Sequence, residues 1–231
     1  KEGGRGEERV RWSLRVNPSS GNLHPTEGYL VSGPVDGLSD TPAVWHYQAH
    51  DHCLERRALL PDAWWKVVAD QLPPGTILVG LSSIYLRESW KYGERAFRYC
   101  QHDVGHAIGA VAYAAAVMGW QLRPLPEVGD WQLSALLGIA GQDGPEAEHP
   151  DLLLALWPGE PGTWDPAGLA SLLPELRPDV AASLSSDHHP WPAIDAAARA
   201  CLRPEGVPPV PKQVRPVSGL DEGPPARLLI R

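Results

Sequence analysis

Two short stretches of this sequence carry side chains whose types and spacing suit chemistry. The first, Pro-Ser-Ser-Gly-Asn at residues 18–22, combines hydroxyl and amide donors with small residues that allow close backbone approach. Such a loop can hold a flat heteroaromatic ring or an anion. The second is the pair Lys91 and Tyr92, an amine and a phenol at a break between helices, where side chains can project into a cleft. From composition alone, the loop is predicted as an ordinary turn and the pair as a solvated corner between helices.

Histidines raise the alternative of a metal site. His46, His50 and His52 lie close to Cys53, while His102 and His106 stand four residues apart and so share one face of a helix. Zinc needs a further ligand, but no Cys-x-x-Cys pair or additional histidine at zinc spacing accompanies either group. The sequence therefore favours surface and structural histidines, assigns no metal ligand, and leaves a metal-binding module as the weakest alternative.

Composition narrows the class of protein. The 231 residues carry a formal net charge of −8 and contain no run of Lys or Arg, which argues against a nucleic-acid partner. Three cysteines at wide, irregular spacing fit a reducing compartment better than a disulfide framework, so a cytoplasmic location is expected. No apolar run approaches the roughly 20 residues that span a bilayer, and no signal-peptide pattern opens the sequence.

The element expected to position the second stretch is the longest periodic segment, residues 91–120, which is predicted to form one long helix. Apolar residues recur there at helical spacing without an internal proline, and Gly119 stands where a left-handed C-cap is expected. The second half of this segment, residues 105–116, is almost free of polar side chains. It is therefore expected to pack against another helix or a second domain.

The other elements alternate without a strict strand–helix–strand repeat, which predicts an α+β fold with helices covering a sheet. Residues 83–90 are predicted to lead Lys91 and Tyr92 into a glycine-containing break just ahead of the long helix. Strands are predicted for a short segment that ends at residue 31, for a hairpin of residues 43–48 and 53–58, and for residues 76–82, 121–125 and 151–157. Further helices are predicted for residues 62–70, 130–137 and 192–202.

Taken together, these motifs resemble a known family. Arg-Val-Asn-Pro-Ser-Ser-Gly-Asn-Leu-His-Pro begins at residue 15, Trp-His-Tyr occupies residues 45–47, and Trp-Lys-Tyr-Gly-Glu-Arg-Ala-Phe-Arg-Tyr at residues 90–99 leads into Asp-Val-Gly-His at residues 103–106. The order and spacing resemble the azoline-dehydrogenase branch of the FMN-dependent nitroreductase superfamily, over residues 11–158. The resemblance implies an α+β, nitroreductase-like three-layer sandwich with a mixed, mainly antiparallel sheet and a long central helix. It also implies FMN as the cofactor, bound at the interface of two such folds, and flavin redox chemistry.

The resemblance assigns roles to individual residues. Lys91 and Tyr92 match the acid/base pair of the peptide-azoline dehydrogenases. Two departures stand beside these matches: the family's opening Arg-Arg-Ser phosphate-binding segment is absent, and the Pro-Ile-Glu-Gly stretch that faces flavin N5 elsewhere appears as Leu-Pro-Glu-Val-Gly at residues 125–129. The residues that match the flavin-contacting loop are Arg15, Pro18, Ser19, Ser20, Gly21 and Asn22.

These matches predict an FMN-dependent oxidoreductase, azoline-dehydrogenase-like or nitroreductase-like, acting on a small-molecule or peptide substrate. Azoline peptides, nitroaromatics and quinones would all fit a shallow pocket in which the substrate stacks on the flavin. An alternative is a non-catalytic pseudo-domain that pairs with a second nitroreductase-like domain. Residues 1–160 are predicted to form the FMN-binding domain, without its N-terminal part, and residues 161–231 a proline-rich extension or linker with one short helix, leading to a second domain. A homodimer or an intramolecular pseudo-dimer is expected.

Overall fold

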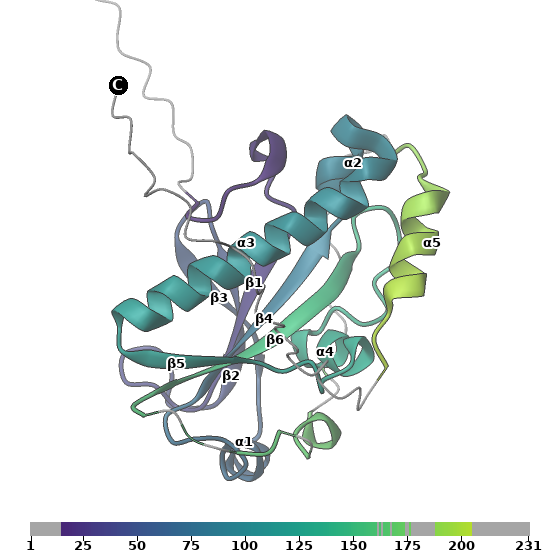
Figure 1. Ribbon diagram of the computed structural model, residues 1–231. Coiled ribbons are helices and arrows are strands. Elements are labelled where there is room, and N and C mark those ends of the chain that lie inside the picture. Colours follow the sequence, from purple (N-terminus) through teal and green to yellow (C-terminus); the bar gives the residue numbers. More distant parts are fainter. Residues whose placement is uncertain are drawn as a thin grey trace, which may run out of the picture.

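The computed structural model describes residues 15–160, 162, 164–166, 168–173, 176 and 188–204 (Figure 1). A six-stranded sheet forms its centre, in the order β3-β2-β1-β4-β6-β5, and all five strand pairings are antiparallel. The strands are β1 (Thr26–Ser32), β2 (Ala43–Gln48), β3 (Cys53–Leu59), β4 (Ile77–Ile84), β5 (Trp120–Pro124) and β6 (Glu148–Pro158). The helices are α1 (Asp62–Ala69), α2 (Leu86–Tyr92), α3 (Ala96–Val117), α4 (Asp130–Leu137) and α5 (Pro192–Cys201), with short 3₁₀ turns at Ser20–Asn22, Gly93–Arg95 and Ala170–Leu172.

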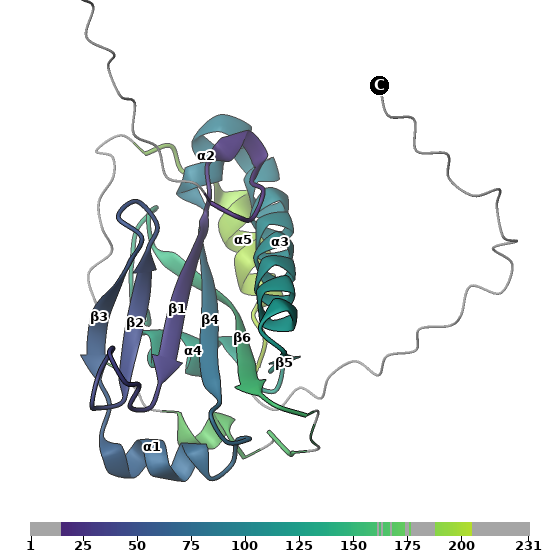
Figure 2. The ribbon, with the colours of Figure 1, turned by 90° about the vertical axis from the view of Figure 1, so that its left-hand side faces the viewer.

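Alternation along the strands places apolar side chains on both faces of the sheet. On one face Leu78 and Leu153 pack with Leu133 of α4, in a core that also includes Val68 of α1. On the other face the apolar side chains of β4, β5 and β6 pack against α3, which lies along the sheet in both views (Figures 1 and 2). Helix, sheet and helix form three layers, so the predicted three-layer α+β sandwich with a mainly antiparallel sheet is confirmed.

The predicted long helix over residues 91–120 is wrong in its first part, because the chain breaks at Gly93. Gly93 adopts φ +59° and ψ −139°, a backbone conformation that L-residues rarely take. An added Cβ there would also lie 3.0 Å from the ring of Trp191. Lys91 therefore belongs to α2, and α3 begins at Ala96. The predicted glycine-containing break ahead of the long helix and the left-handed Gly119 beyond its end (φ +69°) are both confirmed.

The remaining predicted elements are confirmed with small shifts at their ends. The largest shift is in β6, which starts at Glu148 and not at residue 151. A register shift on this strand pairs Leu81 with Leu152 but Ser82 with Pro150, which leaves Asp151 as the extra residue of a bulge. Proline is tolerated at a bulge because no ladder hydrogen bond is lost there. The strand therefore continues past a residue that reads as a strand breaker in the sequence.

Parts of the predicted proline-rich extension pack onto the sandwich. Leu169 is fully buried in the core that also includes residues of α1 and α4, and Ile194 of α5 is buried against Tyr85 and Cys100 beside α3. Residues 161, 163, 167, 174–175, 177–187 and 205–231 of the predicted extension lie outside the described ones. Among the described helices, none has the length and apolar character that crossing a membrane requires.

Candidate functional site

The two stretches predicted to carry chemistry meet in the structure. Gly21 has a left-handed backbone (φ +63°), and a Cβ added there would lie 2.6 Å from Lys91 Nζ and 2.6 Å from Tyr92 Oη. Lys91 Nζ itself lies 5.4 Å from the centre of the Tyr92 ring. The tips of both side chains thus touch the loop backbone at a point where a larger residue would displace them. Segments far apart in the sequence form one surface with an amine and a phenol on it.

Hydrogen bonds within the loop fix its shape. Ser19 Oγ accepts from the His24 backbone N–H at 2.8 Å and contacts Glu88 Oε1 at 3.5 Å. The Asn22 backbone N–H donates to the Ser19 carbonyl at 3.1 Å, and Asn22 Oδ1 contacts His24 Nε2 at 2.7 Å. The Ser19 hydroxyl is therefore committed to protein partners. Gly21 and Asn22, which are exposed, form the part of the loop that a ligand can reach.

Arg15 and Pro18 lie apart from this contact. Arg15 lines an apolar cavity of about 580 Å³ between α3 and strands β1 to β4, and neither Lys91 nor Tyr92 lines that cavity. Burial lowers the pKa of Arg15, and Glu27 opposes that effect. Pro18 lines a hollow of about 690 Å³ over the outer face of α3, and its carbonyl accepts from His106 Nδ1 at 3.1 Å. The predicted binding residues thus divide between three neighbouring surfaces.

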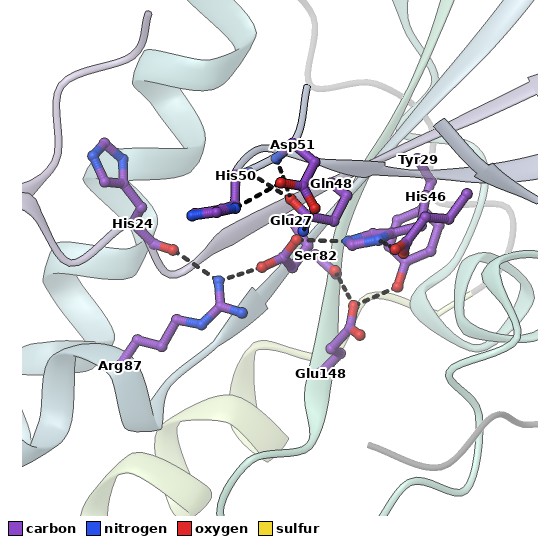
Figure 3. A network of polar contacts seen from close by, with 11 residues as sticks. His24, Glu27, Tyr29, His46, Gln48, His50, Asp51, Ser82, Arg87 and Glu148 are labelled. Carbon is purple, nitrogen blue, oxygen red and sulfur yellow. Dashed lines mark hydrogen bonds and ion pairs between the residues drawn. The ribbon is translucent and has the colours of Figure 1, made fainter. Parts of the chain in front are cut away.

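A buried ionic network fixes α2 to the loop and the sheet (Figure 3). Arg87 donates to the His24 carbonyl at 3.0 Å and pairs with Glu27 of β1. Glu27 in turn contacts His46 Nε2 at 2.7 Å, and His46 Nδ1 contacts Glu55 of β3 at 3.1 Å. Burial alone would raise the pKa of Glu27, but the His46 hydrogen bond and the Arg87 charge together lower it; the Glu27 hydrogen bond raises the pKa of His46. Sequence reasoning missed Arg87 and Glu27, since nothing local marks them as partners.

Two further carboxyl groups, also missed, lie under the loop and the α2–α3 corner. Glu88 and Asp103 are 0% and 1% exposed. Within the described part of the chain, Glu88 Oε2 and both carboxylate oxygens of Asp103 have no hydrogen-bond partner. Burial raises the pKa of Glu88 to about 7, and the nearby Asp103 charge adds to the rise. The sequence signal was the Asp-Val-Gly-His motif, which drew attention to the histidines and not to the aspartate.

The histidines that raised the metal alternative are occupied by other contacts. His46 pairs with Glu27 and Glu55, His52 contacts the Tyr47 hydroxyl at 2.8 Å, and His106 contacts the Pro18 carbonyl. Among the described residues, no group of three or more His, Cys, Asp or Glu side chains is arranged to hold a metal ion. The three cysteines are free thiols, of which Cys100 is buried.

Comparison with known proteins shows which solved structures the fold resembles. No protein-family model matches the sequence, and no curated protein matches it either. The structure is similar to a candidate nitroreductase from Anabaena variabilis, with a TM-score of 0.51 and 25% identity over 62% of this chain and 29% of that one. It is also similar to the E. coli microcin synthetase McbBCD complex with truncated pro-MccB17 bound, with a TM-score of 0.50 and 17% identity over 67% of this chain and 59% of that one. The predicted nitroreductase-like fold is confirmed, and this chain spans less than two thirds of either of these neighbours.

Proposed function

We propose that this protein is a flavin-dependent oxidoreductase that holds FMN against the loop of residues 19–22, beside Lys91 and Tyr92. The observation that carries the proposal is the contact at Gly21, where both side-chain tips lie against an exposed, left-handed glycine. Because Gly21 has no side chain, the tips of Lys91 and Tyr92 come close to the loop backbone, and a flat ring bound against the exposed side of the loop would lie beside both. The nitroreductase-like fold and the sequence resemblance give further support.

The residues of this chain would handle the proton while FMN handles the electrons. When bound, FMN supplies two-electron chemistry by accepting a hydride equivalent from the substrate. Removal of that hydride leaves a proton to be taken from the adjacent atom, and a base near the ring must take it. Lys91 and Tyr92 stand together at this position, so whichever of the two is in its deprotonated form can accept the proton while the other remains beside it. The substrate is proposed to be a small molecule or a peptide containing an azoline ring.

The proposal is tested by titrating the purified protein with FMN and measuring flavin fluorescence and bound flavin after gel filtration. Gly21→Ala places a methyl group between the loop and the Lys91 and Tyr92 tips. The methyl group leaves no room for the two tips against the loop, so the loop backbone that is proposed to hold FMN should shift, and FMN should bind about tenfold more weakly. Gly37→Ala is the matched control, because Gly37 is also left-handed (φ +77°) but a Cβ there meets nothing within 4 Å. Equal FMN affinity in both variants would contradict the proposed site.

One observation favours a second candidate, the non-catalytic pseudo-domain. The stretch at residues 125–129, which corresponds to the family's flavin-facing segment, lies on the α4 side of the sheet, where Leu125 and Val128 are fully buried. Glu127 pairs there with Arg123 at 3.4 Å, away from α3. In this case the protein would complete the site of a second nitroreductase-like domain. A purified protein that is folded by circular dichroism but binds no FMN would favour this candidate over the first.

A further inference from the structure

Glu88 and Asp103 form a buried acidic pair that the flavin proposal does not use. Glu88 lies on α2 and Asp103 on α3, both side chains are fully buried, and the Asp103 charge is the largest charge effect on Glu88. Glu88 Oε1 is 3.5 Å from Ser19 Oγ, while Glu88 Oε2 has no hydrogen-bond partner in the described residues. Asp103 Oδ1 lies 3.9 Å from His106 Nδ1, and neither of its oxygens is hydrogen-bonded by a described residue.

This arrangement disfavours two negative charges. An ionised carboxylate buried without partners is costly, and a second one nearby adds repulsion. Burial first, and then the Asp103 charge, raises the pKa of Glu88 to about 7, whereas the Ser19 hydrogen bond and the Lys91 charge act in the opposite direction. Near neutral pH, Glu88 is therefore balanced between its protonated and ionised forms.

The groups around the pair come from each neighbouring element. On α2, Lys91 lies three residues after Glu88 and hence on the same side of the helix, whereas Arg87, the other cation of this helix, pairs with Glu27. Cys100 and His106 contribute from α3; burial raises the pKa of the Cys100 thiol, so it stays neutral. His24 contributes from the loop, where burial and Arg15 lower its pKa and Asp103 raises it. Among these groups, Lys91 is the positive side chain whose charge lowers the pKa of Glu88.

We propose that Glu88 is a positioning residue whose proton sets the place of Lys91. When Glu88 is protonated, nothing draws the Lys91 amine from its contact with Gly21. When Glu88 is ionised, it attracts the Lys91 ammonium toward its own carboxylate, which lies beside Ser19, and so away from Gly21; it also repels Asp103 across the corner. The consequence for catalysis rests on the proposed function, but the titration of Glu88 does not.

The titration is measured on the purified protein without added flavin, by following the protonated-carboxyl band in the infrared from about pH 5 to about pH 9. The difference between the parent and Glu88→Gln isolates Glu88, which is necessary because burial also raises the pKa of Asp151 to about 7. We expect this difference band to disappear with a midpoint near pH 7. A difference band that is absent above about pH 5.5 would overturn the proposal, because an ordinary glutamate is ionised there.

Two variants should move the midpoint in opposite directions. Asp103→Asn removes a negative neighbour and lowers the midpoint, whereas Ser19→Ala removes a hydrogen bond that favours the charged form and raises it. Glu94→Gln, which changes an exposed carboxylate in the same corner, should leave the midpoint unchanged. Equal midpoints in Asp103→Asn and Ser19→Ala would show that the pair is uncoupled and would overturn the proposal.

Protein stability and flavin chemistry give independent readouts. The folded state binds the Glu88 proton more tightly than the unfolded chain, whose pKa is near 4.5, so stability should fall as the pH rises from about 4.5 through about 7. Glu88→Gln should remove this part of the pH dependence. If FMN binds, Glu88→Gln should also remove the inflection near pH 7 in the flavin reduction rate, which a purely structural residue would not do. If FMN does not bind, the proposed function fails but the infrared midpoint still decides whether Glu88 and Lys91 interact: Lys91→Met removes a charge that lowers the pKa of Glu88 and should raise the midpoint, and an unchanged midpoint would overturn the proposal.

Discussion

At the scale of single residues, Gly21 joins the two halves of the candidate site. Its missing side chain allows Lys91 Nζ and Tyr92 Oη to lie where a Cβ would be only 2.6 Å away. The left-handed backbone is the second requirement, since φ +63° costs other L-residues about 1–2 kcal/mol. Ser19 and Asn22 then act mainly on the loop itself, through His24, and so support the site without having to touch a ligand.

Lys91 and Tyr92 are predicted to carry the proton transfer. In protein with bound FMN, Lys91→Ala and Tyr92→Phe should each slow single-turnover flavin reduction by about 10²–10⁴-fold, because a positioned general base contributes that much. FMN affinity should change little, since the loop backbone remains. Lys66→Ala, at an exposed lysine of α1, is the control and should keep the parent rate. Parent rates in both site variants would leave the pair without a catalytic role.

At the scale of elements, the sequence predicts those helices and strands whose positions follow from periodicity and turn chemistry. Alternation in β2 and β3 and the helical spacing in α3 identify those elements, and Gly119 marks the end of the helix. The predicted start of the long helix is too early because the chain breaks at Gly93, whose positive φ ends α2; Trp191, which lies far away in the sequence, occupies the space where a Cβ would lie. The sequence motifs predict Lys91 and Tyr92 as site residues. Arg87, Glu27, Glu88 and Asp103 could not be predicted, because their pairing depends on which elements become neighbours.

The Arg87 network is predicted to hold α2 in place. Arg87→Met keeps the length of the side chain but leaves the buried Glu27 carboxylate with His46 as its remaining ionic partner, so stability should fall by about 2 kcal/mol. The measurement is urea unfolding at neutral pH. Arg95→Met, at an exposed arginine of the same corner, should change stability by less than about 0.5 kcal/mol.

A double variant separates the ion pair from packing. In Arg87→Met combined with Glu27→Gln, no unpaired charge is left, so part of the lost stability should return. If the two single changes simply add, the cost lies in the packing of the Arg87 side chain and not in the charge that it leaves behind.

At the scale of the whole molecule, the feature to explain is the exposed outer face of α3. The sequence predicts that residues 105–116 pack against another helix or a second domain. Their inner side packs on the sheet through Ala107 and Ala115. On the outer side Tyr113 is 78% exposed and Val117 is 88% exposed, and a Cβ at Gly105 or Gly109 would meet nothing within 4 Å. An apolar helix face with free backbone surface is typical of a protein–protein contact.

We expect a second copy of this protein to cover that face. Static light scattering of the purified protein should therefore give the mass of a dimer. Val117→Glu would bury a charge in the contact, which costs several kcal/mol, and should weaken the dimer by at least about tenfold. It should hardly change monomer stability, because Val117 contacts little within its own chain. Val67→Glu, at a half-exposed valine of α1 on another surface, is the matched control and should remain dimeric. A parent protein that stays monomeric at high concentration would contradict pairing across α3, and loss of the dimer in both variants would place the contact elsewhere.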